Sequence, residues 1–64
     1  MQEMEIQELF ARLTALFEDA AALATEGQTA RLLPELAVRL VQDIATIVAA
    51  SERDLIEVER RLKS

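Results

Sequence analysis

The chain has 64 residues, a net charge of −5, and neither cysteine nor histidine. Without these two residue types it has no disulfide and none of the usual zinc, haem or iron–sulfur ligand sets. A single core in so short a chain supplies about 3–5 kcal/mol of stability at most. We therefore expect one domain over residues 1–64, stabilised further by association with another chain.

Acidic side chains are concentrated in the first part of the chain. Residues 1–26 carry six acidic residues against Arg12 alone, whereas residues 27–64 carry six acidic and six basic residues. An acidic surface disfavours nucleic-acid phosphates and anionic lipid as partners. The first residues lack the basic and apolar regions of a secretory signal, and every window of about 18 residues contains charge, so no membrane span is expected. The expected location is the cytoplasm.

Helix-forming residues dominate the sequence, which has one glycine and one proline. Gly27 is expected directly after a first helix, and Pro34 in the first turn of a second, where its missing N–H needs no partner. The sequence thus predicts a helix over residues 3–26, a turn over 27–33 and a helix over 34–63. The predicted fold class is all-α: a two-helix antiparallel hairpin.

The first predicted helix has a single apolar face. Residues spaced alternately by three and four positions form the a and d positions of a heptad seam: Ile6, Leu9, Leu13, Leu16, Ala20 and Leu23. Phe10, Phe17 and Ala24 flank this seam at seven-residue intervals. This pattern predicts a one-sided amphipathic helix that covers one seam of a partner, with both phenylalanines in the core.

The second predicted helix has an apolar surface wide enough for two seams. One seam comprises Leu40, Ile44, Ile47, Ser51, Leu55, Val58 and Leu62. The other becomes polar beyond residue 50, and the first helix can cover only one of the two. The predicted intrachain core is therefore Leu9, Leu13, Leu16, Leu40, Ile44, Ile47, Leu55 and Val58. The predicted interface with another chain is Val38, Val41, Ala45 and Val48.

Leaving the second seam in water would forgo at least about 1.5 kcal/mol for each valine, which is comparable to the stability of so small a chain. The simplest cover is the same seam of a second copy related by a two-fold axis, which gives a four-helix bundle. A helix of a different protein would fit as well. We expect a homodimer, with a heterologous protein helix as the alternative.

A break at Ser51 would change this organisation. Ser51 and Asp54 have the spacing of a capping box, so a third helix would begin at residue 51. The preceding residues 47–50 contain no helix breaker, and the seam from Leu40 to Leu62 keeps its phase across Ser51. A continuous second helix is the favoured interpretation.

No constellation of catalytic residues is apparent. Ser51 could be a nucleophile, for which no activating base is visible, or a polar contact that sets the helix register. The favoured interpretation is a hydroxyl bonded to the carbonyl oxygen one turn earlier. Carboxylate-bridged metal sites in helical bundles use inward-facing Glu-x-x-His pairs, whereas this chain has no histidine and its acids fall mainly on outward arcs. One glycine cannot build a phosphate-binding loop. We therefore expect no enzyme activity, cofactor or metal.

Basic residues cluster at the end of the second helix: Arg60, Arg61 and Lys63. The helix dipole favours cations there, and Glu57 and Glu59 dilute their positive field. If these cations bind phosphate, a symmetric pair of chains would be a nucleic-acid-associated hairpin dimer whose binding weakens steeply with salt. This is the alternative function.

In length and helix number the chain resembles two kinds of small helical hairpin. These are the RNA-binding hairpin dimers that control plasmid copy number and the small co-chaperones of type III secretion systems that hold needle subunits. The resemblance includes no motif residues, and what it implies is a chaperone-like role. With the surplus apolar seam, the sequence predicts a non-enzymatic protein–protein interaction or oligomerisation module: an adaptor, assembly factor, chaperone-like or regulatory protein.

Overall fold

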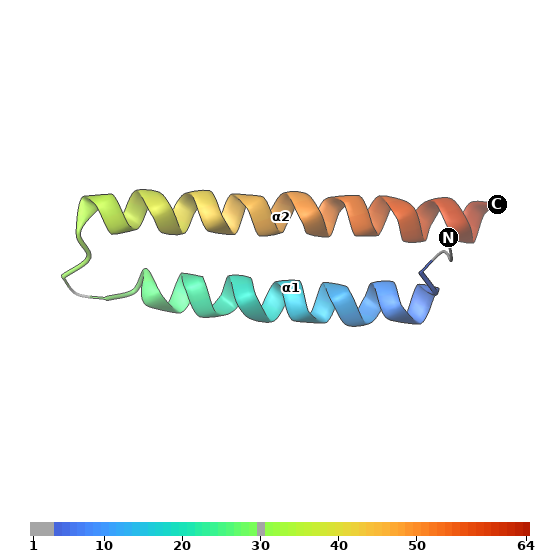
Figure 1. Cartoon of the computed structure of the whole chain (residues 1–64), viewed down its shortest axis with the longest axis horizontal. Helices are drawn as coiled ribbons and strands as arrows, with labels where there is room; N and C mark the ends of the chain where they lie inside the picture. Colours follow the sequence, from blue (N-terminus) through green and yellow to red (C-terminus); the bar gives the residue numbers. More distant parts are fainter. Residues whose placement is uncertain (1–3, 30) are drawn as a thin grey trace.

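A computed structural model describes residues 4–29 and 31–64 of the chain. It consists of two helices, α1 (Ile6–Glu26) and α2 (Pro34–Lys63), which contact each other, run antiparallel and are joined by a turn (Figure 1). The expected all-α hairpin is confirmed. Its dimensions of 48 × 22 × 15 Å are those of a single layer of two helices.

The helix boundaries differ from the expected ones mainly at the start of the chain. α1 begins at Ile6 rather than at residue 3, and residues 1–3 lie outside the described part of the chain. α2 is one continuous helix through Ser51, so no new helix begins there. The Ser51 hydroxyl donates to the Ile47 carbonyl oxygen at 2.9 Å, one turn back along the same helix, instead of capping a new one.

Both helices begin without a side-chain cap. The residues before them, Glu5 and Leu33, have extended backbones, and neither side chain makes a capping hydrogen bond. Pro34 suits the start of α2 because its fixed φ is helical and it has no N–H to satisfy. Three basic residues lie in the last turn of α2, where the helix dipole favours positive charge.

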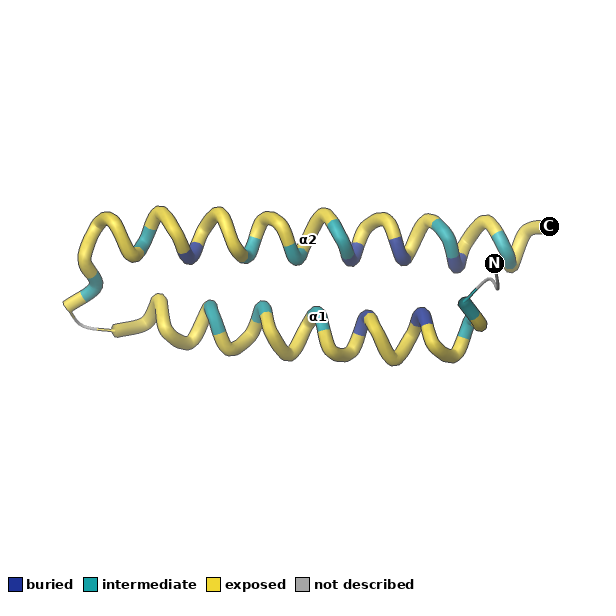
Figure 2. Tube along the Cα trace, viewed as in Figure 1, coloured by how far each residue is buried: buried dark blue, intermediate teal, exposed yellow. Residues whose placement is uncertain are grey.

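The seam between the helices follows a seven-residue repeat. On α1 the inward side chains are the expected ones, each buried or half-buried: Ile6, Leu9, Leu13, Leu16, Ala20 and Leu23. On α2 they are Ala37, Leu40, Ile44, Ile47, Ser51, Asp54, Val58 and Arg61. Figure 2 shows buried and half-buried positions on the sides of the helices that face each other. The hairpin therefore packs through heptad positions a and d.

The C-terminal half of the α2 seam differs from the expectation. Leu55 and Leu62 are 49% and 69% exposed, so the prediction that they lie in the intrachain seam is wrong. Asp54 and Arg61 point inward instead. The reason is that paired helices follow 3.5 residues per turn, from which a straight helix drifts by about 20° per heptad. Two heptads after Leu40, a helical wheel drawn for a straight helix therefore places Leu55 as close to the seam as Asp54.

The hairpin has a thin core. Within the described part of the chain no side chain is completely enclosed, and four apolar residues are buried: Leu9, Leu13, Leu40 and Val58. Phe10 and Phe17 are 52% and 54% exposed, so the prediction that they lie in the core is wrong for the hairpin. Since a domain core normally lies between two packed layers, this single layer encloses its seam incompletely.

Gly27 follows α1 with a right-handed helical backbone, φ −67° and ψ −12°, which alanine adopts without strain. A β-carbon there would lie 3.3 Å from the carbonyl oxygen of Ala24. We predict that Gly27→Ala raises the free energy of unfolding by about 0.4–1 kcal/mol, because alanine restricts the unfolded chain more than glycine does. Urea denaturation followed by circular dichroism, at one chain concentration, measures this change.

The reverse substitution at an exposed helical position, Ala49→Gly, is the control. It should lower the free energy of unfolding by roughly 0.5–1 kcal/mol. A Gly27→Ala variant less stable than the parent chain would contradict the prediction. The turn would then be too tight to accept a methyl group beside the Ala24 carbonyl oxygen.

Candidate protein-interaction surface

An unbroken row of apolar side chains runs along α2 outside the seam. Val41, Val48, Leu55 and Leu62 follow one another at seven-residue intervals, and the most exposed of them, Leu62, is 69% accessible to solvent. Because their spacing matches the repeat of the seam, they stay beside it along the whole helix. A continuous row of large apolar side chains indicates a contact surface, whereas single exposed apolar residues do not.

α1 has a matching row. Phe10, Phe17 and Ala24 are exposed and, like the α2 row, lie one position after the d residues of their helix. In an antiparallel pair, rows at this heptad position lie on the same side of the seam. Both rows therefore share one face of the hairpin, which we name the apolar face: Phe10, Phe17, Ala24, Val41, Val48, Leu55 and Leu62.

Two polar contacts fix the register of the apolar face. Arg12 pairs with Asp54, and Arg61 donates a hydrogen bond to the carbonyl oxygen of Met4. Because the helices are antiparallel, each residue forward along α1 lies beside one residue back along α2. This places the residues of the apolar face in three neighbouring pairs, which we call levels. From the termini to the turn they are Phe10 with Leu55, Phe17 with Val48, and Ala24 with Val41. The side chains on this face therefore become smaller toward the turn.

A shallow groove of about 290 Å³ lies at the turn end of the hairpin. Nine residues line it, of which Gln28 is the polar one, and three are small: Ala24, Gly27 and Ala37. Ala24 and Val41 line the groove from different helices and both belong to the apolar face. The groove therefore opens on that face and is suited to an apolar side chain.

The four residues predicted to form the interchain interface are all exposed: Val38, Val41, Ala45 and Val48. Val41 and Val48 belong to the apolar face, while Val38 and Ala45 lie one row farther from α1. The remaining large residues of this face were expected in the core or the intrachain seam rather than on a surface: Phe10, Phe17, Leu55 and Leu62. The strict seven-residue interval within each row is the signal that identifies these residues. A helical wheel of 100° per residue obscures this interval, because it shifts residues seven positions apart by about 20°.

The other side of the seam is mainly charged. The corresponding positions there are Arg12, Asp19 and Glu26 on α1 and Leu36, Asp43, Ala50 and Glu57 on α2. Two of these seven are apolar, and one of the two is a small alanine. Charged side chains at such positions favour contact with water over contact with a further helix. The hairpin thus has one apolar face and one charged face.

Polar groups also occupy the seam itself. The Ser51 hydroxyl bonds back to the Ile47 carbonyl oxygen, as the structural interpretation of this residue predicted. Asp54 is buried, an exception to the expectation that the acids lie mainly on outward arcs. Arg12 Nε lies 3.0 Å from Asp54 Oδ2, yet this buried oxygen accepts no hydrogen bond. We interpret the pair as a contact that sets helix register rather than as a reaction centre.

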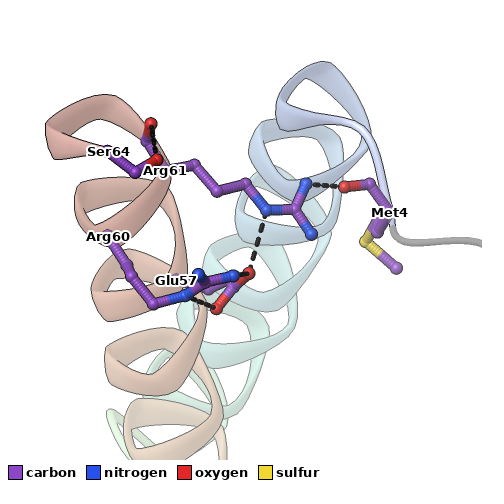
Figure 3. Close-up of polar contacts among 5 residues, drawn as sticks. All are labelled: Met4, Glu57, Arg60, Arg61 and Ser64. Atoms are coloured by element: carbon purple, nitrogen blue, oxygen red, sulfur yellow. Dashed lines mark hydrogen bonds and ion pairs between the residues drawn. The ribbon is translucent and has the colours of Figure 1, made fainter.

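Arg60 and Arg61 at the end of α2 are paired with the acidic neighbour Glu57 (Figure 3). Arg60 donates to both carboxylate oxygens of Glu57, at 3.0 and 2.6 Å, and Arg61 donates to the same carboxylate at 2.9 Å. Lys63 pairs with an acidic residue one turn earlier, at 3.1 Å. These pairs reduce the positive field that a nucleic-acid phosphate would meet at this end of the hairpin.

Comparisons of the chain with protein-family models, with curated proteins and with solved structures give no match. Over residues 4–29 and 31–64, neither helix is long and apolar enough to cross a membrane. Within the same ranges, no three acidic side chains gather as they would around a metal ion. The function proposed for the apolar face therefore rests on its geometry and chemistry.

Removing the cationic partner of Asp54 should destabilise the hairpin. Arg12→Met keeps the apolar stem of the side chain but leaves a buried carboxylate without its cation. We expect the free energy of unfolding at pH 7 to fall by about 1–2 kcal/mol, a value limited by the solvent around Arg12, whose side chain is 49% exposed. Urea denaturation at one chain concentration measures the change.

The double variant Arg12→Met/Asp54→Leu is the control, because it also replaces the buried carboxylate with an apolar d residue. It should be at least as stable as the parent chain. If the double variant is as unstable as Arg12→Met alone, the loss arises from packing at residue 12 and not from the uncompensated charge of Asp54.

The Glu57 carboxylate has a lowered pKa. Hydrogen bonds from Arg60, and secondarily from Arg61, lower this pKa from 4.5 to about 2. Because folding favours the charged form, the group stabilises the fold above pH 4.5, and this stabilisation disappears as the pH falls toward 2. NMR titration of the Glu57 side-chain carboxyl carbon should give a midpoint near 2.

The matched variant for this titration is Arg60→Gln, which removes the largest cause of the shift. The midpoint of Glu57 should then rise toward 4.5. A midpoint already close to 4.5 in the parent chain would mean that neither arginine holds the carboxylate in solution.

Proposed function

We propose that this chain is a non-enzymatic protein–protein interaction module that assembles through its apolar face, with a second copy of itself as its partner. The observation that carries the proposal is the continuous exposed row from Val41 to Leu62 on α2, beside Phe10 and Phe17 of α1. Helical adaptors, assembly factors and chaperone-like proteins bind by laying such a face against another helix.

The accessible surface of the hairpin supports this proposal. The hairpin exposes 5240 Å², whereas a compact chain of the same mass, 7.2 kDa, exposes about 4,100 Å². A compact body of twice that mass exposes about 6,800 Å², so two fully packed hairpins would remove about 3,600 Å² from water. Obligate homodimers bury roughly 2,000–5,000 Å² in total.

The energy of burial points the same way. Six of the seven side chains on the apolar face are large. Full burial of each contributes about 1.5–3 kcal/mol, and about half of that remains to be gained because these side chains are 49–69% exposed in the hairpin. Summed over both copies, this remaining gain is comparable to the whole stability of a domain, about 5–15 kcal/mol. It is large enough to offset the cost of association, about 4–15 kcal/mol. Two copies related by a two-fold axis would present identical faces to each other and form a four-helix bundle.

Nucleic-acid binding through Arg60, Arg61 and Lys63 is the second function expected from the sequence. The acidic partners of these residues and the net charge of −5 do not favour it. Such a function requires binding at low salt that weakens steeply as salt rises. The apolar face favours a protein partner.

Charges placed on the apolar face should prevent assembly. In Val41→Glu/Val48→Glu, pairing would bury two carboxylates without partners. We expect the parent chain to have twice its chain mass by light scattering, and the double variant to be monomeric or unfolded. Circular dichroism of the variant distinguishes these two states.

Gln42→Glu/Ala49→Glu is the matched control, since it adds the same charge at the same spacing on exposed positions of α2 that point away from the seam. It should keep the mass of the parent chain. A parent chain that is a well-folded monomer would overturn the proposal, and this is also the result expected if the natural partner is a different protein. A Val41→Glu/Val48→Glu variant that keeps the parental mass would overturn it too.

A further inference from the structure

The apolar face is graded in side-chain size, and the groove lies at its small end. Phe10 is level with Leu55 near the termini, whereas Ala24 is level with Val41 at the turn. The groove of about 290 Å³ lies beside Ala24, where the α1 row has no large side chain. The face therefore offers a bulky ring at one end and an apolar hollow at the other.

Two-fold symmetry allows two ways of placing one apolar face on another. With both turns at the same end, α1 of one copy lies against α2 of the other. Phe10 then meets Leu55 of the second copy, and Ala24 meets Val41 of the second copy. Large side chains crowd together near the termini, and only small ones meet at the turn, where the groove stays unfilled.

With the turns at opposite ends, each helix lies antiparallel to its own equivalent. Phe10 then meets Ala24 of the second copy, Phe17 meets Phe17, and Leu55 meets Val41. The level with the largest side chains of one copy thus faces the level with the smallest of the other, and the two middle levels face each other. The side-chain volume is therefore nearly uniform along the bundle. Protein cores pack to uniform density, and facing positions that alternate large and small side chains achieve it.

We propose that two copies of this hairpin pack with their turns at opposite ends, and that the groove beside Ala24 of each copy receives the phenyl ring of Phe10 from the other. This geometry rests on the self-association proposed above and specifies it. Phe10 is 52% exposed in the single hairpin, so its side chain has surface left to bury. Small groove residues such as Ala24 and Ala37 let the ring approach the backbone closely.

Complementary size changes at residues 10 and 24 test the contact. Phe10→Ala leaves the groove of the partner empty, and Ala24→Phe brings two rings to the same place, so each should weaken dimerisation by about tenfold or more. Mixed together, the two variants place one ring at each groove of a heterodimer. Native mass spectrometry should then show heterodimer well above one half, roughly the share given by random pairing.

The preference cannot arise within one copy, because residues 10 and 24 lie about 21 Å apart along α1. Phe17→Ala mixed with Ala24→Phe is the matched control. Residue 17 does not face residue 24 in either arrangement, so this mixture should pair at random. Circular dichroism of each variant confirms that the hairpin still folds.

A label near the turn measures the arrangement independently. The chain has no cysteine, so Glu35→Cys gives one spin label per chain on an exposed position of α2. In the proposed arrangement the two labels are about 40 Å apart, because each lies 13 residues from the central level at 1.5 Å per residue. With both turns at one end they are within about 25 Å. Pulsed electron paramagnetic resonance separates these distances.

The results distinguish this inference from the proposed function. A dimer with the long label distance and excess heterodimer supports both. A dimer with the short distance, or with random pairing of Phe10→Ala and Ala24→Phe, overturns the ring-in-groove arrangement and leaves self-association in place. A monomeric parent chain overturns both.

Discussion

The structure depends on one constraint: two helices in a single layer shelter only the side chains that point directly at each other. In this hairpin those are the a and d residues, and even there complete enclosure is missing from the described part of the chain. Most side chains one position away stay exposed on both sides of the seam, whereas Ala50 and Glu57 are half-buried. On the charged side this suits Asp19 and Asp43; on the apolar side it leaves Val41 and Leu55 unsheltered.

The hairpin itself was predictable because its signals are local. Gly27 and Pro34 mark the turn, and the alternation of three and four residues in α1 defines its inward side without reference to α2. The α2 seam beyond Ser51 was not predictable in the same way. That helix offers two apolar rows, and which of them faces inward depends on how the paired helices wind around each other.

The candidate surface was predictable in part for a related reason. Val41 and Val48 stood out because they belong to a second apolar seam of α2, and α1 can cover only one of the two seams. Phe10 and Phe17 did not, since a large apolar residue next to a seam looks like a core residue until its partner is known. Asp54 is the opposite case: a carboxylate at a d position is explained only by Arg12, which comes from the other helix.

The charged side of the seam limits how far any assembly through the apolar face can grow. A layer with apolar faces on both sides can stack without limit, because each added layer exposes another apolar face, as in a fibre. Here the far side presents Arg12, Asp19, Asp43 and Glu57 instead. If two hairpins pair through their apolar faces, both outer surfaces of the pair carry these residues, three acidic against one basic. The same net negative charge on each outer surface then opposes the addition of a third layer. Under the proposed self-association, the same sequence therefore limits the assembly to two layers.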